Sequence, residues 1–199
     1  MGGIRAPVNL RRDGSVCTGG PQLGFAAGWI GIENSAGTSI AQIGFIHVYD
    51  PNLGVGKYCE FWAIDGGAAH LYNCGAWGDD ALLHFMITKG TSYYNIQDCG
   101  SGSGYSNCTS KNATQSIYSS AFALVSAETN YGRSGCTVHI MGTSADPQVE
   151  GATGDPIQGK HDGDAWGTKS LTASGPVCSH YHQGAANAYN HAWDDRNAS

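Results

Sequence analysis

Hydrophobic and polar residues alternate with a period of two in the densest apolar part of the chain, residues 24–65. An extended segment over 39–49 places Ile40, Gln42 and Ile46 on one side, and both of its sides are largely apolar. This pattern predicts a central strand that is covered on both faces. Together with its neighbours it predicts three strands, at residues 24–33, 39–49 and 57–65, joined by glycine-bearing turns.

The rest of the chain continues as short apolar runs separated by turn signals. We expect further strands at 68–73, 80–88, 92–97, 117–128 and 136–141, a polar loop at 99–116, and long loops from 142 to 175. Residues 1–22, with Pro7, Pro21 and several glycines, predict an irregular N-terminal arm. The apolar spacing in 183–195 is compatible with a short C-terminal helix. The overall prediction is an all-β, two-sheet antiparallel sandwich or jelly roll, with residues 23–199 as a single domain.

Composition agrees with this fold class and excludes two kinds of partner. The chain has 199 residues, of which 30 are glycine, 41% are hydrophobic and only 13% are charged, as in turn-rich β proteins. The net charge is −6 and Lys plus Arg number 10, without a basic cluster, so a nucleic acid partner is not expected. No apolar stretch approaches the length of a membrane span.

Seven cysteines are scattered through the chain without the paired spacing of zinc sites. Scattered cysteines among Gly, Ser and Asn favour disulfides and an oxidising, extracellular location. Cys99 and Cys108 flank a short loop and are the first candidates for a local bridge. The odd number leaves one thiol free or paired between chains. The residues after Met1 lack the apolar core of a signal peptide, and a virion protein released by lysis would satisfy both observations.

Three motifs in the first half of the chain carry a family resemblance. They are Trp29-Ile-Gly-Ile-Glu33, Gln42-Ile-Gly-Phe45 and Tyr58-Cys-Glu-Phe-Trp62. Their order resembles the glutamic peptidases (eqolisins), which carry Trp-Val-Gly-Ile-Asp, Gln-x-Gly and Trp-Tyr-Glu-Trp-Tyr-Pro. The segment Ala123–Glu128 has the length of that family's Ala-Glu-aromatic-Ile-x-Glu strand, with Leu124 at its first acid. The ending Trp193-Asp-Asp-Arg196 is similar to that of uncharacterised bacterial secreted proteins of this type.

The resemblance implies a concanavalin-like β-sandwich and an acid endopeptidase. It implies Gln42 and Glu128 as catalytic residues, and a substrate cleft lined by Trp29, Glu33, Glu60 and Trp62. Peptide hydrolysis needs a base for water and a donor for the developing oxyanion, roles that Glu128 and the Gln42 amide would fill. A Glu beside a second carboxylate in an apolar cleft has a raised pKa, which suits acid conditions.

Other functions fit the same residues. Gln42 in a central strand can simply satisfy neighbouring polar groups, and Glu128 can simply be solvated. One alternative is a non-catalytic, lectin-like module that binds glycan or peptide in the same cleft. Another is a structural or adhesive protein of a virion or appendage surface, which would self-associate.

Two short patterns raise the question of a metal. His180 and His182 would share one side of a strand, and Asp162 and Asp164 could offer oxygen ligands. Neither forms a closed four-ligand set, so we predict no metal and no cofactor.

Overall fold

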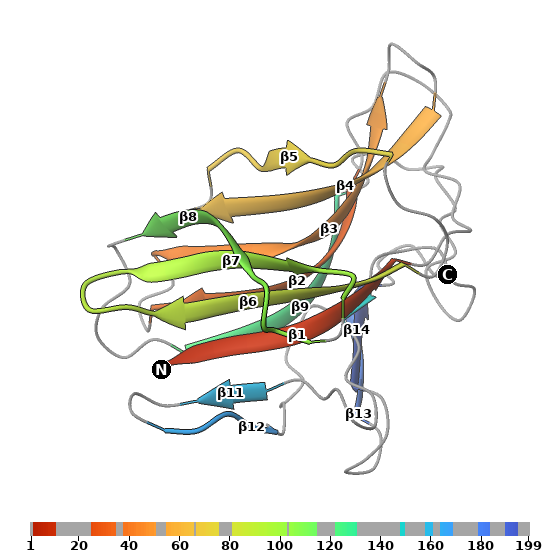
Figure 1. Cartoon of the computed structure of the whole chain (residues 1–199). Helices are drawn as coiled ribbons and strands as arrows, with labels where there is room; N and C mark the ends of the chain where they lie inside the picture. Colours follow the sequence, from red (N-terminus) through yellow and green to blue (C-terminus); the bar gives the residue numbers. More distant parts are fainter. Residues whose placement is uncertain are drawn as a thin grey trace.

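In the described part of the chain, two large antiparallel sheets pack face to face, and two further strands form a small sheet of their own (Figure 1). The computed structural model describes residues 2–10, 25–34, 38–50, 55–65, 67–75, 81–102, 104–114, 122–130, 148–149, 158–160, 164–168, 179–183 and 190–194. Within these residues the regular structure is strand only, and no helix is long and apolar enough to cross a membrane. The predicted all-β sandwich is confirmed.

One sheet has seven strands in the order β12-β11-β1-β6-β7-β8, with β10 also pairing with β1. Its strands are β1 (Gly3–Leu10), β6 (Ala81–Lys89), β7 (Tyr94–Gly100), β8 (Thr109–Thr114), β10 (Gln148–Val149), β11 (Gln158–Lys160) and β12 (Gly167–Thr168).

The other sheet has five strands in the order β5-β4-β3-β2-β9. Its strands are β2 (Phe25–Glu33), β3 (Ile40–Asp50), β4 (Val55–Ile64), β5 (His70–Tyr72) and β9 (Phe122–Asn130). The predicted strands at 24–33, 39–49 and 57–65 are therefore confirmed as β2, β3 and β4 of one sheet. The predicted strand at 136–141 lies outside the described residues.

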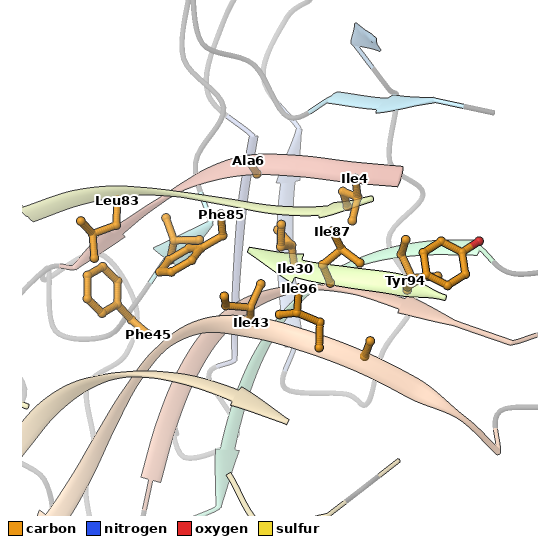
Figure 2. Close-up of a cluster of buried hydrophobic side chains, with 13 residues drawn as sticks. Ile4, Ala6, Ile30, Ile43, Phe45, Leu83, Phe85, Ile87, Tyr94 and Ile96 are labelled. Atoms are coloured by element: carbon orange, nitrogen blue, oxygen red, sulfur yellow. The ribbon is translucent and has the colours of Figure 1, made fainter. Parts of the chain in front are cut away.

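The main core fills the space between the two sheets (Figure 2). The seven-stranded sheet contributes inward-pointing residues such as Ile4 and Phe85, and the five-stranded sheet contributes Ile30, Ile43 and Phe45. The rings of Phe45 and Phe85 meet edge to face across the interface, with centroids 5.9 Å apart. Each of these residues is essentially inaccessible to solvent, so burial of this apolar layer is the main force that holds the sheets together.

Residues 3–10 are strand β1 in the interior of a sheet, so the predicted irregular arm is wrong for these residues. Apolar residues Ile4, Ala6 and Val8 alternate inward toward the core. Pro7 pairs with His84 of β6 on one side of β1. On the other side, β11 pairs with residues 3–5 and β10 with residues 8–9, so no described strand pairs with Pro7 there, and proline interrupts the ladder on at most one side. Residues 11–22 lie outside the described part of the chain.

Two further segments differ from the sequence-based expectation. Residues 109–114, expected in a loop, form edge strand β8, which pairs with β7. Residues 179–183 and 190–194 form an antiparallel pair, β13 (Ser179–Gln183) and β14 (Asn190–Asp194), in place of the suggested helix. A short isolated helix is marginal in water, whereas strand pairing satisfies the backbone of both segments.

Among the described residues, two disulfides tie strands at the edges of the sandwich to neighbouring segments. Cys99 is bonded to Cys108, which confirms the predicted local bridge between β7 and the start of β8. Cys59 of β4 is bonded to Cys74, just after β5. Both bridges close short loops and so restrict the unfolded chain.

Candidate active site on the outer face of the five-stranded sheet

The pairing register of the five-stranded sheet decides which face each candidate residue occupies. Directly paired residues of adjacent antiparallel strands share a face, and successive residues alternate between faces. Ile30 and Ile43 form one cross-strand row and point into the core, which defines the inner face. Trp29 and Gln42 occupy alternate positions and therefore belong to the outer face, which points away from the seven-stranded sheet.

Gln42 lies in a row of small residues. Its direct partners are Gly31 on β2 and Ala63 on β4. The Gln42 side chain is half-buried, and it makes no hydrogen bond or ion pair with any residue that the structure describes. Both neighbours are small and buried, and Gln42 is the half-buried member of this row.

The indole of Trp29 lies over Gly31, next to Gln42. A Cβ built on Gly31 would come within 2.7 Å of Cζ3 of the ring, so only glycine accommodates the ring there. On the other side of Trp29, a Cβ on Gly44 would lie 2.1 Å from the Gly28 carbonyl oxygen. Trp29 itself is 7% exposed and packs in a second apolar cluster on this face, with Ala27, Ile46, Cys59 and Phe61. The ring is therefore fixed beside Gln42.

Glu33 occupies the next outer-face row, opposite Ile40. It is the diagonal neighbour of Gln42, a relation that spans roughly 7–8 Å between strands. Glu33 is half-buried and, like Gln42, makes no hydrogen bond or ion pair to the described residues. The outer face thus changes from a buried apolar end at Trp29 to a half-exposed polar end at Gln42 and Glu33.

The start of β3, which carries this polar end, is held firmly on both sides. On the β2 side, the Asn34 carboxamide accepts hydrogen bonds from the amides of Thr38 (2.9 Å) and Ser39 (3.2 Å). On the β4 side, the Asp65 carboxylate accepts hydrogen bonds from the Ser39 hydroxyl and from the Ile40 amide. These short-range bonds fix the backbone two residues before Gln42.

By the pairing register, position 128 belongs to the outer face, as Gln42 does, but it lies in a different cross-strand row. Glu128 of β9 pairs with Ala27 of β2, whereas Gln42 pairs with Gly31, four residues further along β2. Four residues of strand and two strand spacings put their α-carbons about 16 Å apart. In the register, the β2 position between their rows is Trp29. The position that faces Gln42 across Gly31 is Leu124.

Glu60 and Trp62 lie on the inner face of β4, away from Gln42. Glu60 is completely buried, and its Oε1 accepts a hydrogen bond of 2.8 Å from Asn73. Trp62 packs against the inter-sheet core and stacks on His70, with ring centroids 3.9 Å apart. The register therefore separates both residues from the expected cleft around Gln42. Because Glu60 lies on the other face, it is not the second carboxylate that was expected to raise the pKa of a carboxyl group beside Gln42.

Glu60 is part of a polar cluster between the sheets that sequence reasoning missed. Burial, with a smaller contribution from the Asp98 and Glu60 carboxylates, raises the pKa of Tyr72 above its ordinary value. Lys111 pairs with Asp98 at 3.2 Å and lies 4.3 Å over the Tyr72 ring. Glu60 and Asp98 come from different sheets and neither of these disulfides joins their strands, so no sequence signal pointed to this cluster.

The candidate metal ligands are not assembled by the described part of the chain. No group of three His, Cys, Asp or Glu side chains that could hold a metal occurs among the described residues. His180 and His182 lie on β13, as their spacing predicted for a strand, but their side chains are outside the description. Asp164 is exposed, and Asp162 is not among the described residues.

The two packed sheets form a β-sandwich whose fold is similar to that of a glutamic peptidase. Among solved structures, the chain is similar to scytalido-glutamic peptidase, which was solved with a transition state analog inhibitor. The match has a TM-score of 0.55 and 12% sequence identity, and it covers 97% of this chain and 92% of that one. At this identity the match shows the fold alone, which confirms the predicted sandwich. No family model and no curated protein sequence matches the chain.

Proposed function

We propose that this protein is an endopeptidase that binds an extended peptide over the outer face of the five-stranded sheet, at Gln42. The observation that carries the proposal is the Gln42 amide, which is uncommitted to any described residue. It stands beside the fixed Trp29 indole on a row of small residues. The chemistry is suggested by the resemblance of the motifs around Trp29 and Gln42 to the glutamic peptidases, and the fold is similar to that of one such enzyme.

In the proposed reaction the Gln42 amide N–H donates a hydrogen bond to the carbonyl oxygen of the scissile peptide. A carboxylate of the same face takes a proton from a water molecule, whose oxygen bonds to the carbonyl carbon. The negative charge that develops on the carbonyl oxygen is stabilised by Gln42. The C–N bond then breaks as the carboxyl group gives its proton to the leaving amine. The family resemblance assigns this acid–base role to Glu128.

We also propose that the protein works outside the cell. The two disulfides in the described part of the chain are stable in an oxidising compartment, whereas disulfides are reduced in most cytosols.

The test is hydrolysis of a reduced and carboxymethylated protein from pH 3 to pH 8, with new termini mapped by mass spectrometry. Gln42→Ala should lower kcat by about 10²–10³-fold, the usual effect of losing one oxyanion donor. The matched control is Gln97→Ala, since Gln97 is also half-buried but bonds to Thr88 on the other sheet. Wild-type protein that cleaves nothing over this range, or equal loss in both variants with intact folding, would refute the proposal.

A non-catalytic module that binds peptide or glycan on the same face is the second candidate. The observation that favours it is the separation of about 16 Å between the α-carbons of Gln42 and Glu128, estimated from the strand register. Under this alternative, the wild-type chain would bind peptide or glycan in a Gln42-dependent way without cleaving any substrate.

A further inference from the structure

We propose that Glu33, rather than Glu128, is the catalytic carboxylate that acts with Gln42. The inference rests on the proposed function and assigns a residue to its acid–base step. Three observations on the outer face carry it: the register of β2 against β3, the hydrogen-bonding state of the two side chains, and the nature of the neighbouring rows.

The register makes Glu33 the nearer of the two carboxylates. Glu33 pairs with Ile40, two residues before Gln42 on β3, so the two candidate side chains are diagonal neighbours on one face. Diagonal pairs of long side chains span roughly 7–8 Å between their α-carbons and reach each other or a shared ligand. A water molecule and one peptide carbonyl would fit between a carboxylate and an amide at this separation. Glu128 lies about twice as far away, with the Trp29 position between the two rows.

Both side chains are available to a ligand. Neither Glu33 nor Gln42 makes a hydrogen bond, an ion pair or a ring contact with any part of the chain that the structure describes. Both are half-buried, so each is partly desolvated without a polar partner among the described residues. Their backbone, by contrast, is fixed, since Asn34 follows Glu33 directly and closes the turn to Ser39 with a backbone hydrogen bond of 2.9 Å. A fixed backbone with uncommitted polar ends is the arrangement that a catalytic pair requires.

The neighbouring rows favour Glu33 as well. The Glu33 row is the half-exposed end of the face, where Ile40 is also half-buried. The row of Glu128 contains Ala27, Ile46 and Cys59, all of them buried. Substrate and water would therefore reach the Glu33 end of the face more readily than the row that contains Ala27.

The step balances with water as the only co-reactant. The Glu33 carboxylate accepts a proton from water while the water oxygen bonds to the carbonyl carbon, and the carbonyl π electrons move onto the oxygen that Gln42 contacts. The C–N bond breaks as the carbonyl reforms, and Glu33 returns its proton to the amine nitrogen. The products are a carboxylic acid and an amine, and Glu33 is again a carboxylate.

The test compares Glu33→Gln, Glu33→Asp and Glu128→Gln on a quenched fluorescent peptide that spans a mapped cleavage site. Glu33→Gln should lower kcat by about 10²–10⁴-fold while KM stays within about twofold, because only the acid–base group is lost. Its residual activity should lose the acidic limb of the wild-type pH profile. Glu33→Asp should keep measurable activity, and its pH profile should keep the acidic limb. Glu128→Gln should change KM more than kcat, as for a residue that binds substrate further along the face.

The outcomes separate this inference from the function on which it rests. Near-wild-type kcat in Glu33→Gln, together with loss of kcat in Glu128→Gln, would overturn the role of Glu33 and leave the peptidase proposal standing. Wild-type protein without any cleavage would overturn both. Near-ultraviolet circular dichroism of each variant shows whether it folds. If Glu33→Gln does not fold, Glu33→Asp decides, since a reduced kcat at unchanged KM supports the inference and unchanged kcat refutes it.

Discussion

Replacing Gly44 with alanine tests the packing that holds Trp29 beside Gln42. A Cβ at this position would lie 2.1 Å from the carbonyl oxygen of Gly28 and 2.7 Å from Cα of Trp29. Both neighbours are backbone atoms of β2, which is paired with β3 along its whole length. Because contacts below 3.0 Å are essentially never seen for real Cβ atoms, β2 and β3 would have to separate by at least about 0.9 Å.

The cost of this separation follows from the interactions that it disrupts. Moving two paired strands apart by that amount stretches the adjacent backbone hydrogen bonds beyond bonding distance, at about 1 kcal/mol each. Forcing an extra methyl group into a packed site adds about 1–3 kcal/mol. We therefore expect Gly44→Ala to lower the free energy of unfolding by about 3 kcal/mol or more. For a chain of this length, the midpoint of thermal unfolding should fall by roughly 6–12 °C.

Two other glycines serve as controls in the same measurement, which is urea unfolding followed by tryptophan fluorescence without reductant. At Gly31 the new Cβ would lie 2.7 Å from Cζ3 of the packed Trp29 ring and 3.1 Å from the Ala41 carbonyl oxygen, so Gly31→Ala should also destabilise, by about 1–3 kcal/mol. At Gly102 a Cβ meets nothing within 4 Å, so the change should stay within about 0.5 kcal/mol. If Gly44→Ala is as stable as Gly102→Ala, the close approach of β2 and β3 at this point is wrong.

Three further predictions concern the rest of the fold. Tyr72 has a raised pKa in the folded state, so the wild type should lose roughly 1 kcal/mol of stability relative to Tyr72→Phe between pH 9 and pH 11, as unfolded tyrosine ionises near pH 10. An unchanged difference in urea titrations at the two pH values would contradict this. Replacing Cys59 and Cys74 with serine should cost about 3 kcal/mol, since their bridge closes a 15-residue separation; equal midpoints would argue against the bridge. Phe45→Ala should cost about 3–5 kcal/mol in the same assay, because the ring is fully buried. A cost below 1 kcal/mol would show that Phe45 is not in the core.

The fold was predictable wherever strand sequences show alternation and clear boundaries. Strands β2, β3 and β4 have both features, and their positions were read from the sequence to within a few residues. Strand β8 has neither, because Thr109–Thr114 contains no large apolar residue. It forms through pairing with β7 and the neighbouring Cys99–Cys108 bridge, which are non-local interactions. Pro7 was a local signal against a strand in β1. Among the described strands, neither β10 nor β11 pairs with Pro7, so its missing N–H disturbs the sheet less than in a fully paired strand.

The candidate site was predictable in its members but not in their grouping. Trp29, Glu33 and Gln42 were all identified from short motifs, and the structure places them together on one face. Glu60 was also identified, but it lies on the opposite face of the sheet, buried beside Tyr72 and Asp98. Face membership depends on the relative register of strands, which is set by the loops and cross-strand packing and not by the residues of a motif.

A shared order of residues along the chain does not establish which residues converge at a catalytic site. Aligned motifs fix the order Trp29, Gln42, Glu60 and Glu128 along the chain. They do not fix the row in which each residue stands. A shift of one residue moves a side chain to the other face, and a shift of two moves it about 7 Å along the same face. Catalytic groups must converge within a few ångströms on one carbonyl. Here the convergent pair by register is Glu33 and Gln42, so the acid–base assignment should follow the rows of the sheet and not the order of the motifs.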